Sequence, residues 1–207
     1  MDLAFYVTTF VTLFVIIDPI GTTPLFVALT QGSSAQERRK IGTRAICIGF
    51  GLLTLFAFLG EQVLGFAGIS MSAFRIAGGI LLFLTALQML FEKRNKRRED
   101  QASEQPAEDP SVFPLATPLI AGPGSITTVI LLTGDANGDL FATFAILGMV
   151  LLVLVSLFIL FLSAGLLERV LGQTGINVIT RLLGMLLAAL AVQFVLDGLR
   201  DFGLAPL

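Results

Sequence analysis

Six long apolar stretches, separated by short polar segments, dominate the pattern of hydrophobic and polar positions along the chain. They cover residues 4–29, 42–60, 71–91, 113–133, 140–166 and 179–199. A helix needs roughly 20 mainly apolar residues to cross the hydrocarbon core of a bilayer, and each stretch is close to or above that length. The pattern therefore predicts an all-α, polytopic membrane protein with six transmembrane helices.

Composition supports this prediction. Of the 207 residues, 55% are hydrophobic and only 14% are charged, whereas about 25% of the residues in a soluble domain are charged. The first residues, MDLAFYVTTF, have Asp2 where a secretory signal peptide has Lys or Arg, and they contain no small-residue cleavage site. We therefore expect the first apolar stretch to be retained as a transmembrane span.

The absence of histidine and the single cysteine argue against several classes of function. The chain has no histidine and a single cysteine, Cys47, so it lacks the commonest general base and the usual imidazole ligand of metals and haem. Six spans also leave no room for a soluble catalytic domain. We expect no enzymatic activity, no metal site and no cofactor. The net charge of −2 gives no indication of nucleic-acid binding.

The distribution of basic residues predicts the orientation. The loop after the first stretch holds Arg38, Arg39, Lys40 and Arg44, and the loop after the third stretch holds a second basic cluster within residues 93–98. Cytoplasmic loops carry an excess of Lys and Arg, so both termini should lie on the periplasmic or extracellular side. We expect a multi-pass protein of the cell inner (plasma) membrane.

The third loop divides the chain into two similar halves. Residues 92–112 are polar and rich in Glu, Gln and Pro, which predicts a flexible cytoplasmic linker between residues 1–91 and 113–207. RIAGGILLFLTALQ, which starts at Arg75, and RLLGMLLAALAVQ, which starts at Arg181, share Arg, Gly, Leu and Leu at intervals of three. Because each half has an odd number of spans, we predict a 3+3 inverted repeat, an architecture of many secondary transporters.

The first apolar stretch is interrupted near its middle, in FVTLFVIIDPIGTTPLFVALT. Pro19 and Pro24 lack a backbone donor and would clash with the carbonyl four residues earlier in a continuous helix, and a charge such as Asp18 costs roughly 2.5–3.5 kcal/mol or more at the bilayer centre. Irregular backbone at this depth must face protein or a water-filled cavity. We predict a half-helix to Ile17, unwound backbone over residues 18–22 and then a second half-helix.

The fourth apolar stretch repeats this interruption, in PLATPLIAGPGSITT, with Pro123 near its centre and unwound backbone predicted over residues 121–125. In the first stretch, Pro24 fits the first turn of the second half-helix, and Thr22 or Thr23 would cap that turn. A proline kink that serves only packing is the alternative for either stretch alone. Matching places in the two halves favour spans one and four that are both broken at mid-membrane.

Two half-helix N-termini at mid-membrane predict a binding site for a small zwitterion. Their unpaired N–H groups and positive dipole ends suit a substrate carboxylate, while unwound carbonyls and Asp18 suit an ammonium group or a coupling cation. The candidate substrate-binding residues are Asp18, Gly21, Thr22, Thr23, Gly122, Gly124 and Ser125, with Ser125 as a plausible helix cap. Asp18 is also the candidate for a coupling proton or sodium ion, and Pro19, Pro24 and Pro123 break the helices.

The segments IIDPIGTTPLF, PLATPLIAGPGSITT and RLLGMLLAALAVQFVLDGLR resemble the MarC family of bacterial inner-membrane proteins, which is named for multiple antibiotic resistance. The resemblance covers essentially the whole chain, although the family commonly has Asn at the position of Thr22. It implies similarity to a group of small neutral amino acid transporters, with glycine and alanine as typical substrates.

These observations favour a cation-coupled secondary transporter of small neutral amino acids. Its partners would be the lipid bilayer, a small zwitterionic substrate and a proton or sodium ion. One alternative is an exporter of other small metabolites or drugs, and another is a membrane scaffold or regulatory protein without flux of its own. An intramembrane enzyme is a third, but Asp18 has no second intramembrane carboxylate clearly beside it.

The sequence leaves open the roles of four further polar residues, namely Arg75, Arg181, Gln193 and Asp197. The two arginines are interpreted as snorkelling anchors, or as gates that pair with Glu61 or Glu168. Glu61 by itself is interpreted as an interfacial residue. Gln193 and Asp197 are four residues apart and should share one face of a helix.

Overall fold

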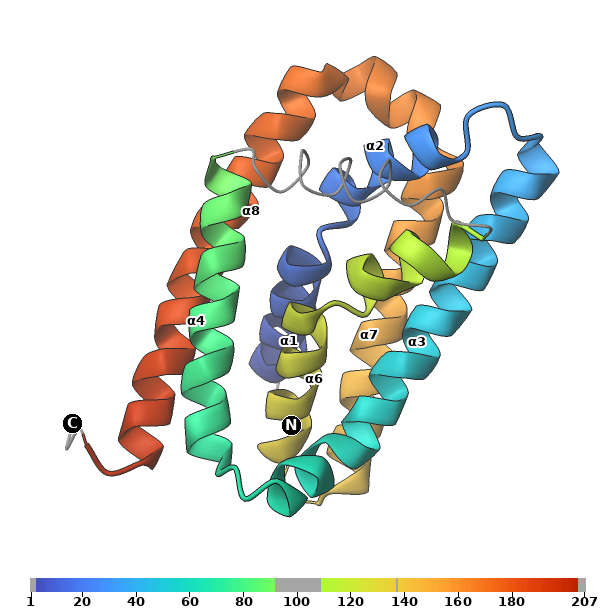
Figure 1. Cartoon of the computed structure of the whole chain (residues 1–207). Helices are drawn as coiled ribbons and strands as arrows, with labels where there is room; N and C mark the ends of the chain where they lie inside the picture. The colour runs from blue at the N-terminus through green and yellow to red at the C-terminus, as the bar shows by residue number, and fades with distance from the viewer. Residues whose placement is uncertain (1–2, 92–108, 137, 205–207) are drawn as a thin grey trace.

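A computed structural model describes residues 3–91, 109–136 and 138–204, and the regular structure of these residues is helical throughout (Figure 1). The helices are α1 Leu3–Ile17, α2 Pro19–Leu29, α3 Ala35–Phe66, α4 Met71–Leu90, η1 Ser111–Ile120, α6 Pro123–Gly134, α7 Leu140–Leu162 and α8 Ala164–Asp201. Five segments are long and apolar enough to cross a membrane, with α1 and α2 taken together as one segment. The count rises to six if η1 and α6, which are bent by 53°, form one span. The prediction of an all-α protein with several apolar spans is confirmed, whereas the inverted repeat stays a prediction.

Polar residues between the apolar stretches set the helix starts. Ser34 and Glu37 form a capping box at the start of α3, in which the Ser34 hydroxyl accepts from the Glu37 amide at 3.3 Å and the Glu37 carboxylate accepts from the Ser34 amide at 2.8 Å. Asp139 caps α7 by accepting from the Phe141 amide at 2.8 Å. Because the capping box lies in the polar loop, α3 begins seven residues before the predicted apolar stretch at residue 42.

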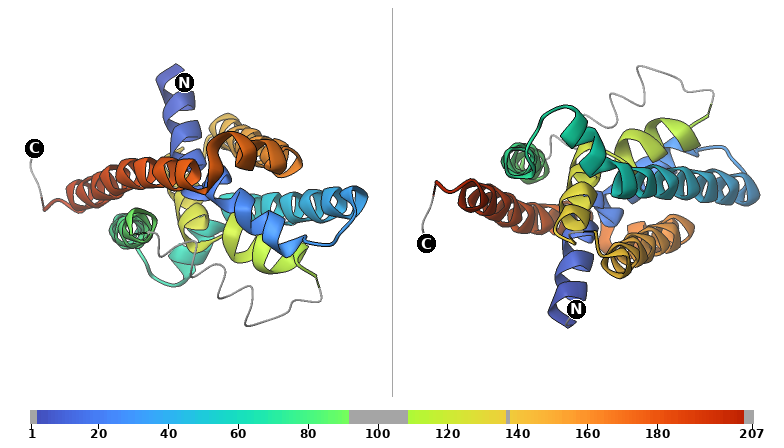
Figure 2. Two further views of the ribbon diagram at one scale, coloured as in Figure 1. Left: turned by 90° about the horizontal axis from the view of Figure 1, so that it is seen from above. Right: turned by 90° about the horizontal axis from the view of Figure 1, so that it is seen from below.

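The α1 helix lies between two hydrophobic clusters. Leu13 and Ile17 belong to a cluster built with α2, α3, η1, α6 and α7, and Val15 and Ile16 belong to a second one built with α4 and α8. Viewed along the bundle, α1 and α6 lie between the α4–α8 pair and the α3–α7 side, while the N-terminal part of α1 projects from the bundle (Figure 2). The C-terminal end of α1 is therefore surrounded by every layer of the fold.

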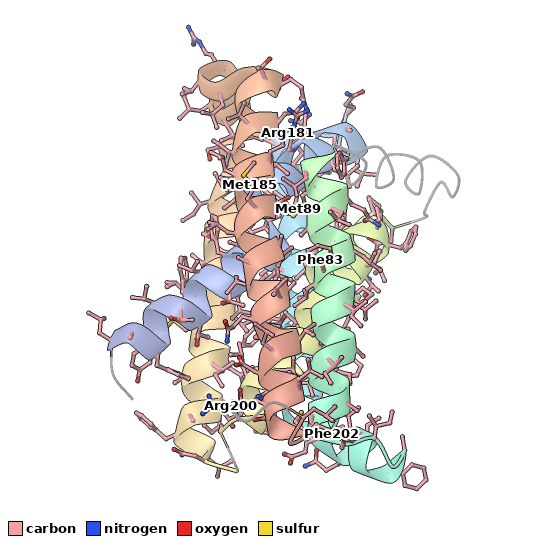
Figure 3. All side chains as sticks on the ribbon, turned by 90° about the vertical axis from the view of Figure 1, so that its left-hand side faces the viewer. Phe83, Met89, Arg181, Met185, Arg200 and Phe202 are labelled. Carbon is pink, nitrogen blue, oxygen red and sulfur yellow. The ribbon has the colours of Figure 1, made fainter. Side chains whose placement is uncertain are left out.

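Glycines allow α4 and α8 to pack closely side by side (Figure 3). A Cβ atom on Gly79 would lie 2.7 Å from the Ala191 carbonyl oxygen, and one on Gly184 would lie 2.9 Å from the Met89 Cβ. Small residues bring helix backbones together in this way in membrane proteins. This contact holds the third and sixth apolar stretches against each other.

The structure differs from the predicted boundaries in two places. The predicted loop between the fifth and sixth stretches is helical, because α8 begins at Ala164 and changes direction at Gly172, which has φ 58° and ψ 176°. Its first part arches over the end of the bundle next to α2 (Figure 1). Most of the predicted linker 92–112 lies outside the described residues, but Ser111 and Val112 already belong to η1.

We expect Gly172→Ala to lower the free energy of unfolding by about 1–3 kcal/mol, because its backbone conformation is accessible to glycine almost alone. Gly148 of α7 is the matched control, since a Cβ there meets no atom within 4 Å and its φ is not positive. Gly148→Ala should be neutral or stabilising by up to about 1 kcal/mol. Thermal unfolding of the purified variants in detergent measures both effects, and equal midpoints for the two variants would contradict the expectation.

Candidate functional site

The first break is a single residue, Asp18, whose left-handed backbone (φ 55°, ψ 66°) redirects the chain between α1 and α2. Its side chain is 0% exposed. The carboxylate accepts a hydrogen bond from the Gly21 amide at 3.1 Å and so caps the N-terminus of α2, with Pro19 in the first helical position. A negative group at a helix N-terminus is favoured by the helix dipole.

The predicted unwinding over residues 18–22 is therefore wrong in extent, since α2 is helical from Pro19 onward. Aspartate tolerates the left-handed region, so one residue suffices for the turn. Neither threonine caps α2, because the Thr22 hydroxyl donates to the Ile17 carbonyl at 3.2 Å and the Thr23 hydroxyl donates to the Pro19 carbonyl at 2.7 Å. Pro24 lies inside α2 rather than in its first turn.

The second break comprises Ala121 (φ −92°, ψ 65°) and Gly122 (φ −90°, ψ 171°), and α6 starts at Pro123. Unwinding is thus limited to two of the five predicted residues, 121–125. Ser125 caps the helix from the third helical position, where its hydroxyl accepts from the Gly122 amide at 2.9 Å and donates to the Ile120 carbonyl at 2.6 Å. The two breaks therefore use opposite cap arrangements, with the capping side chain before α2 but inside α6.

The prolines of η1 explain why the segment before the second break is irregular. Phe113 (φ −126°, ψ 129°) and Thr117 (φ −131°, ψ 125°) have extended backbone, and each precedes a proline, Pro114 or Pro118. A residue before proline is disfavoured in the α region because the proline ring clashes with it. Regular helix resumes only at Pro123.

The two breaks lie next to each other in the middle of the bundle. A Cβ atom on Gly124 would lie 3.4 Å from Ile16 Cγ2 and 3.1 Å from Leu82 Cδ2, so the first turn of α6 packs on the last turn of α1. The predicted site residues Asp18, Gly21, Thr22, Thr23, Gly122 and Ser125 are all buried, and Gly124 is partly buried. The structure brings them together in two neighbouring segments, while their role in binding stays a prediction.

Two backbone amides at this junction lie outside the helical hydrogen-bond ladder. The ladder of α6 begins with the Ile126 amide, which donates to the Gly122 carbonyl at 2.9 Å. The amides of Gly124 and Ser125 precede it, in the first turn, where a helix leaves its N–H groups without carbonyl partners. In contrast, the Gly21 amide donates to the Asp18 carboxylate and the Gly122 amide donates to the Ser125 hydroxyl.

A cavity of about 220 Å³ opens between α2 and the first part of α8. Its lining residues are Thr23, Pro24, Val27, Ala28 and Gln31 of α2, and Ala164, Leu167, Glu168, Gln173 and Ile176 of α8. Of the predicted binding residues, Thr23 alone is among them. The α8 residues were not predicted as binding residues, because all of them except Ala164 fall in the predicted loop after residue 166, and the hydrophobic pattern gives no sign of its packing on α2. Glu168 was considered only as a gate partner of an arginine.

At the opposite end of the bundle, Arg75 joins three helices. Its guanidinium pairs with Asp135, which follows α6, and with Asp201 at the end of α8, the latter at 2.6 Å. The Arg75 side chain is 11% exposed. The two gate partners considered from the sequence, Glu61 and Glu168, are therefore not the partners of this arginine.

One further sequence expectation concerns two polar residues of α8. The Gln193 amide donates to the Asp197 carboxylate at 2.8 Å, which confirms the predicted contact along one helix face. Within the described residues, no group of three or more His, Cys, Asp or Glu side chains is placed to hold a metal ion.

The raised pKa of Asp135 leads us to expect that the stability of the protein depends on pH. Although the Asp135 side chain is 58% exposed, partial burial raises the pKa of its carboxyl above the ordinary 3.8 and outweighs the nearby Arg75 charge, while Asp201 and Asp197 add to the increase. A raised pKa means that the protonated form contributes stability below pH 3.8, and that this contribution is lost as the pH rises through the raised value. The ion pair with Arg75 would lower the pKa, but burial has the larger effect.

We therefore expect Asp135→Asn to be neutral or slightly stabilising at pH 7, by less than about 1 kcal/mol, and Asp201→Asn to be destabilising by a similar amount. The difference in midpoint between Asp135→Asn and the parent should grow as the pH is raised from about 3.5 to 7. Thermal unfolding in detergent across this range provides the measurement. A larger loss for Asp135→Asn than for Asp201→Asn at pH 7 would show that the ion pair outweighs burial.

Comparison with known proteins identifies the family. The family described as MarC family integral membrane protein matches residues 3–202. The UPF0056 membrane protein MJ1677 of Methanocaldococcus jannaschii is 38% identical over 97% of this chain and 98% of its own length. The UPF0056 membrane protein YhcE of Escherichia coli is 37% identical over 96% of this chain and 94% of its own length. The UPF0056 membrane protein YvbG of Bacillus subtilis is 34% identical over 97% of this chain and 96% of its own length. No solved structure matches significantly.

These matches extend over nearly the whole chain, including both broken segments and the Arg75 and Asp201 positions. They agree with the apolar helices, which are long enough for a multi-pass arrangement. The chain belongs to the MarC family of integral membrane proteins.

Proposed function

We propose that the protein is a secondary transporter that moves small neutral amino acids such as glycine and alanine across the membrane, coupled to a cation. The observation that carries the proposal is Asp18, a fully buried carboxylate at the start of a half-helix. It lies where the first turn of a second half-helix packs on the end of α1. Ionisable residues at membrane depth are costly and commonly mark substrate or ion paths.

The chemistry of the junction suits both ends of a zwitterion. The first-turn amides of Gly124 and Ser125 offer donors for a carboxylate at a positive helix end. Asp18 offers an acceptor for an ammonium group, a proton or a sodium ion. Gly124 packs close to Ile16 and Leu82, so a ligand bound at its amide would have room only for a small side chain, and this supports glycine or alanine.

Unequal access from the two ends of the bundle supports alternating access. The cavity at the α2 end includes Thr23, whose hydroxyl is bonded to Pro19, the residue after Asp18. The other end is held by the ion pairs of Arg75 with α6 and α8. The orientation predicted from the basic residues would make the open end cytoplasmic. The cavity of about 220 Å³ also falls below the range of about 300–1,000 Å³ typical of drug-sized ligands, which supports small solutes over drug efflux.

Flux in reconstituted liposomes tests the proposal. Purified protein should accumulate glycine and alanine above protein-free liposomes when a pH gradient or a sodium gradient is imposed, and leucine should accumulate much less. Folding and insertion are checked in the same preparation by protease protection and thermal unfolding. If folded, inserted protein moves neither glycine nor alanine under either gradient, the proposal is wrong and a scaffold role becomes the better explanation.

A further inference from the structure

The cavity between α2 and α8 has an unusual distribution of charge. Glu168 is the one charged side chain among its lining residues. Among the described residues, the ion pairs involve Arg44 and Arg75, and Glu168 takes part in none of them. Within the described part of the chain, the cavity lining thus holds one carboxylate, on the exposed residue Glu168, and no lysine or arginine.

Neutral polar groups complete the cavity. The Thr23 hydroxyl uses its hydrogen in the bond to the Pro19 carbonyl at 2.7 Å, so the lone pairs of its oxygen can accept from a ligand. Thr23 is only 1% exposed and so lies on the inner wall. The side-chain amides of Gln31 and Gln173 can donate or accept hydrogen bonds. The Gln173 amide also donates a hydrogen bond to the Asn177 side-chain oxygen at 3.2 Å, which restricts its orientation.

These groups select for one kind of ligand chemistry. An ammonium group finds the Glu168 carboxylate and hydroxyl and amide oxygens, whereas a lone anion meets a carboxylate without any lysine or arginine. The remaining walls, which include Val27, Leu167 and Ile176, are apolar, and the volume of about 220 Å³ limits the ligand to a small solute.

We propose that this cavity is a second binding site, specific for the ammonium group of small solutes, which zwitterions occupy before they reach Asp18. The binding part of this inference stands on the cavity itself, whereas the passage on to Asp18 rests on the proposed transport function. Thr23 connects the two sites, because it lines the cavity and its hydroxyl is bonded to the residue that follows Asp18.

Thiol labelling at the cavity tests the charge selectivity. Cys47 is exposed and is first replaced in a Cys47→Ala background, and Ala28→Cys then places one cysteine on the cavity wall. A methanethiosulfonate with a trimethylammonium group should label Cys at position 28 about threefold more slowly at low ionic strength when Glu168→Gln is added. A sulfonate-bearing reagent should react no more slowly, or faster.

The matched control is Gln36→Cys in the same background, since Gln36 is an exposed residue of α3 outside the cavity. Its labelling should not respond to Glu168→Gln. The same two cysteines test ligand binding: glycine and methylammonium should protect the cavity cysteine against labelling, acetate should not, and Glu168→Gln should weaken the protection.

Equal protection by acetate, or a cavity cysteine whose labelling by the cationic reagent is unchanged in Glu168→Gln, would overturn the site. The result is independent of liposome flux. Protection by ammonium solutes without glycine transport would support the cavity site and refute the transport proposal. Glycine transport without protection would support the transport proposal and refute the cavity site.

Discussion

Asp18→Asn should leave the protein folded and inserted but lower gradient-driven accumulation of glycine at least about tenfold, because a hydrogen bond to a charged group contributes roughly 1.5–3 kcal/mol. Asparagine keeps the shape of the side chain, tolerates the left-handed backbone and can still accept from the Gly21 amide, which Asp18 does at 3.1 Å. Only the charge and the ability to bind a proton are removed. The loss should therefore report on function rather than on folding.

Two measurements on this variant separate the possible roles of Asp18. If it carries a coupling proton, binding and exchange of glycine should persist while concentrative uptake driven by pH is lost. If it is a fixed charge for an ammonium group or sodium ion, the affinity itself should fall, and uptake in the parent protein should not follow the pH gradient. Unchanged affinity together with unchanged accumulation would leave Asp18 as a structural cap alone.

Asp139→Asn is the matched control for Asp18→Asn. Asp139 is also an aspartate that caps a helix, since it accepts from the Phe141 amide at 2.8 Å, but it is exposed at the start of α7. The same substitution there changes the same chemistry at an exposed helix start. We expect glycine affinity and accumulation to match the parent protein.

Gly21→Ala should abolish glycine accumulation about as fully as Asp18→Asn and also lower the free energy of unfolding by about 1–3 kcal/mol. A Cβ at this position would lie 2.3 Å from one carboxylate oxygen of Asp18 and 2.9 Å from its Cγ. The backbone of α2 fixes that Cβ, so the carboxylate has to leave the cap. Glycine flux and thermal unfolding of the same preparation measure the two effects.

The control for this variant is Gly51→Ala in α3, where a Cβ meets no atom within 4 Å. It should be neutral or stabilising by up to about 1 kcal/mol, since glycine is the poorer helix former. Adding Asp18→Asn to Gly21→Ala should lower glycine accumulation little further, because contacting residues do not act additively. Accumulation by Gly21→Ala at the parent level would show that the position of the carboxylate is unimportant.

Local chemistry explains what the sequence could predict here. Proline and glycine act on their immediate neighbours, so the breaks at Asp18 and at Gly122 could be placed from the sequence, along with the apolar helices. The extent of unwinding could not be predicted, because it depends on whether one left-handed residue and its cap can replace a longer loop. At the first break, Asp18 and its cap on the Gly21 amide do replace a longer loop.

Long-range contacts explain what the sequence could not predict. Arg75 meets partners 60 and 126 residues away, and no local pattern identifies which carboxylates these are. The cavity at the α2 end likewise depends on the conformation of Gly172, which directs the first part of α8 across α2. Periodicity reports the face of a helix that is apolar, but not the path of the chain after a glycine.

The two breaks are capped by side chains of different charge, a carboxylate at the first and a hydroxyl at the second, and this difference affects the charge moved in each transport cycle. Asp18 is the one charged side chain among the buried residues that the structure describes, and Ser125 contributes only a neutral hydroxyl at the second break. With Asp18 as the coupling group, each cycle would carry one cation together with one electrically neutral amino acid. Transport would then be electrogenic, with a stoichiometry of one charge per solute, and a membrane voltage of 100 mV would supply about 2.3 kcal/mol to each cycle.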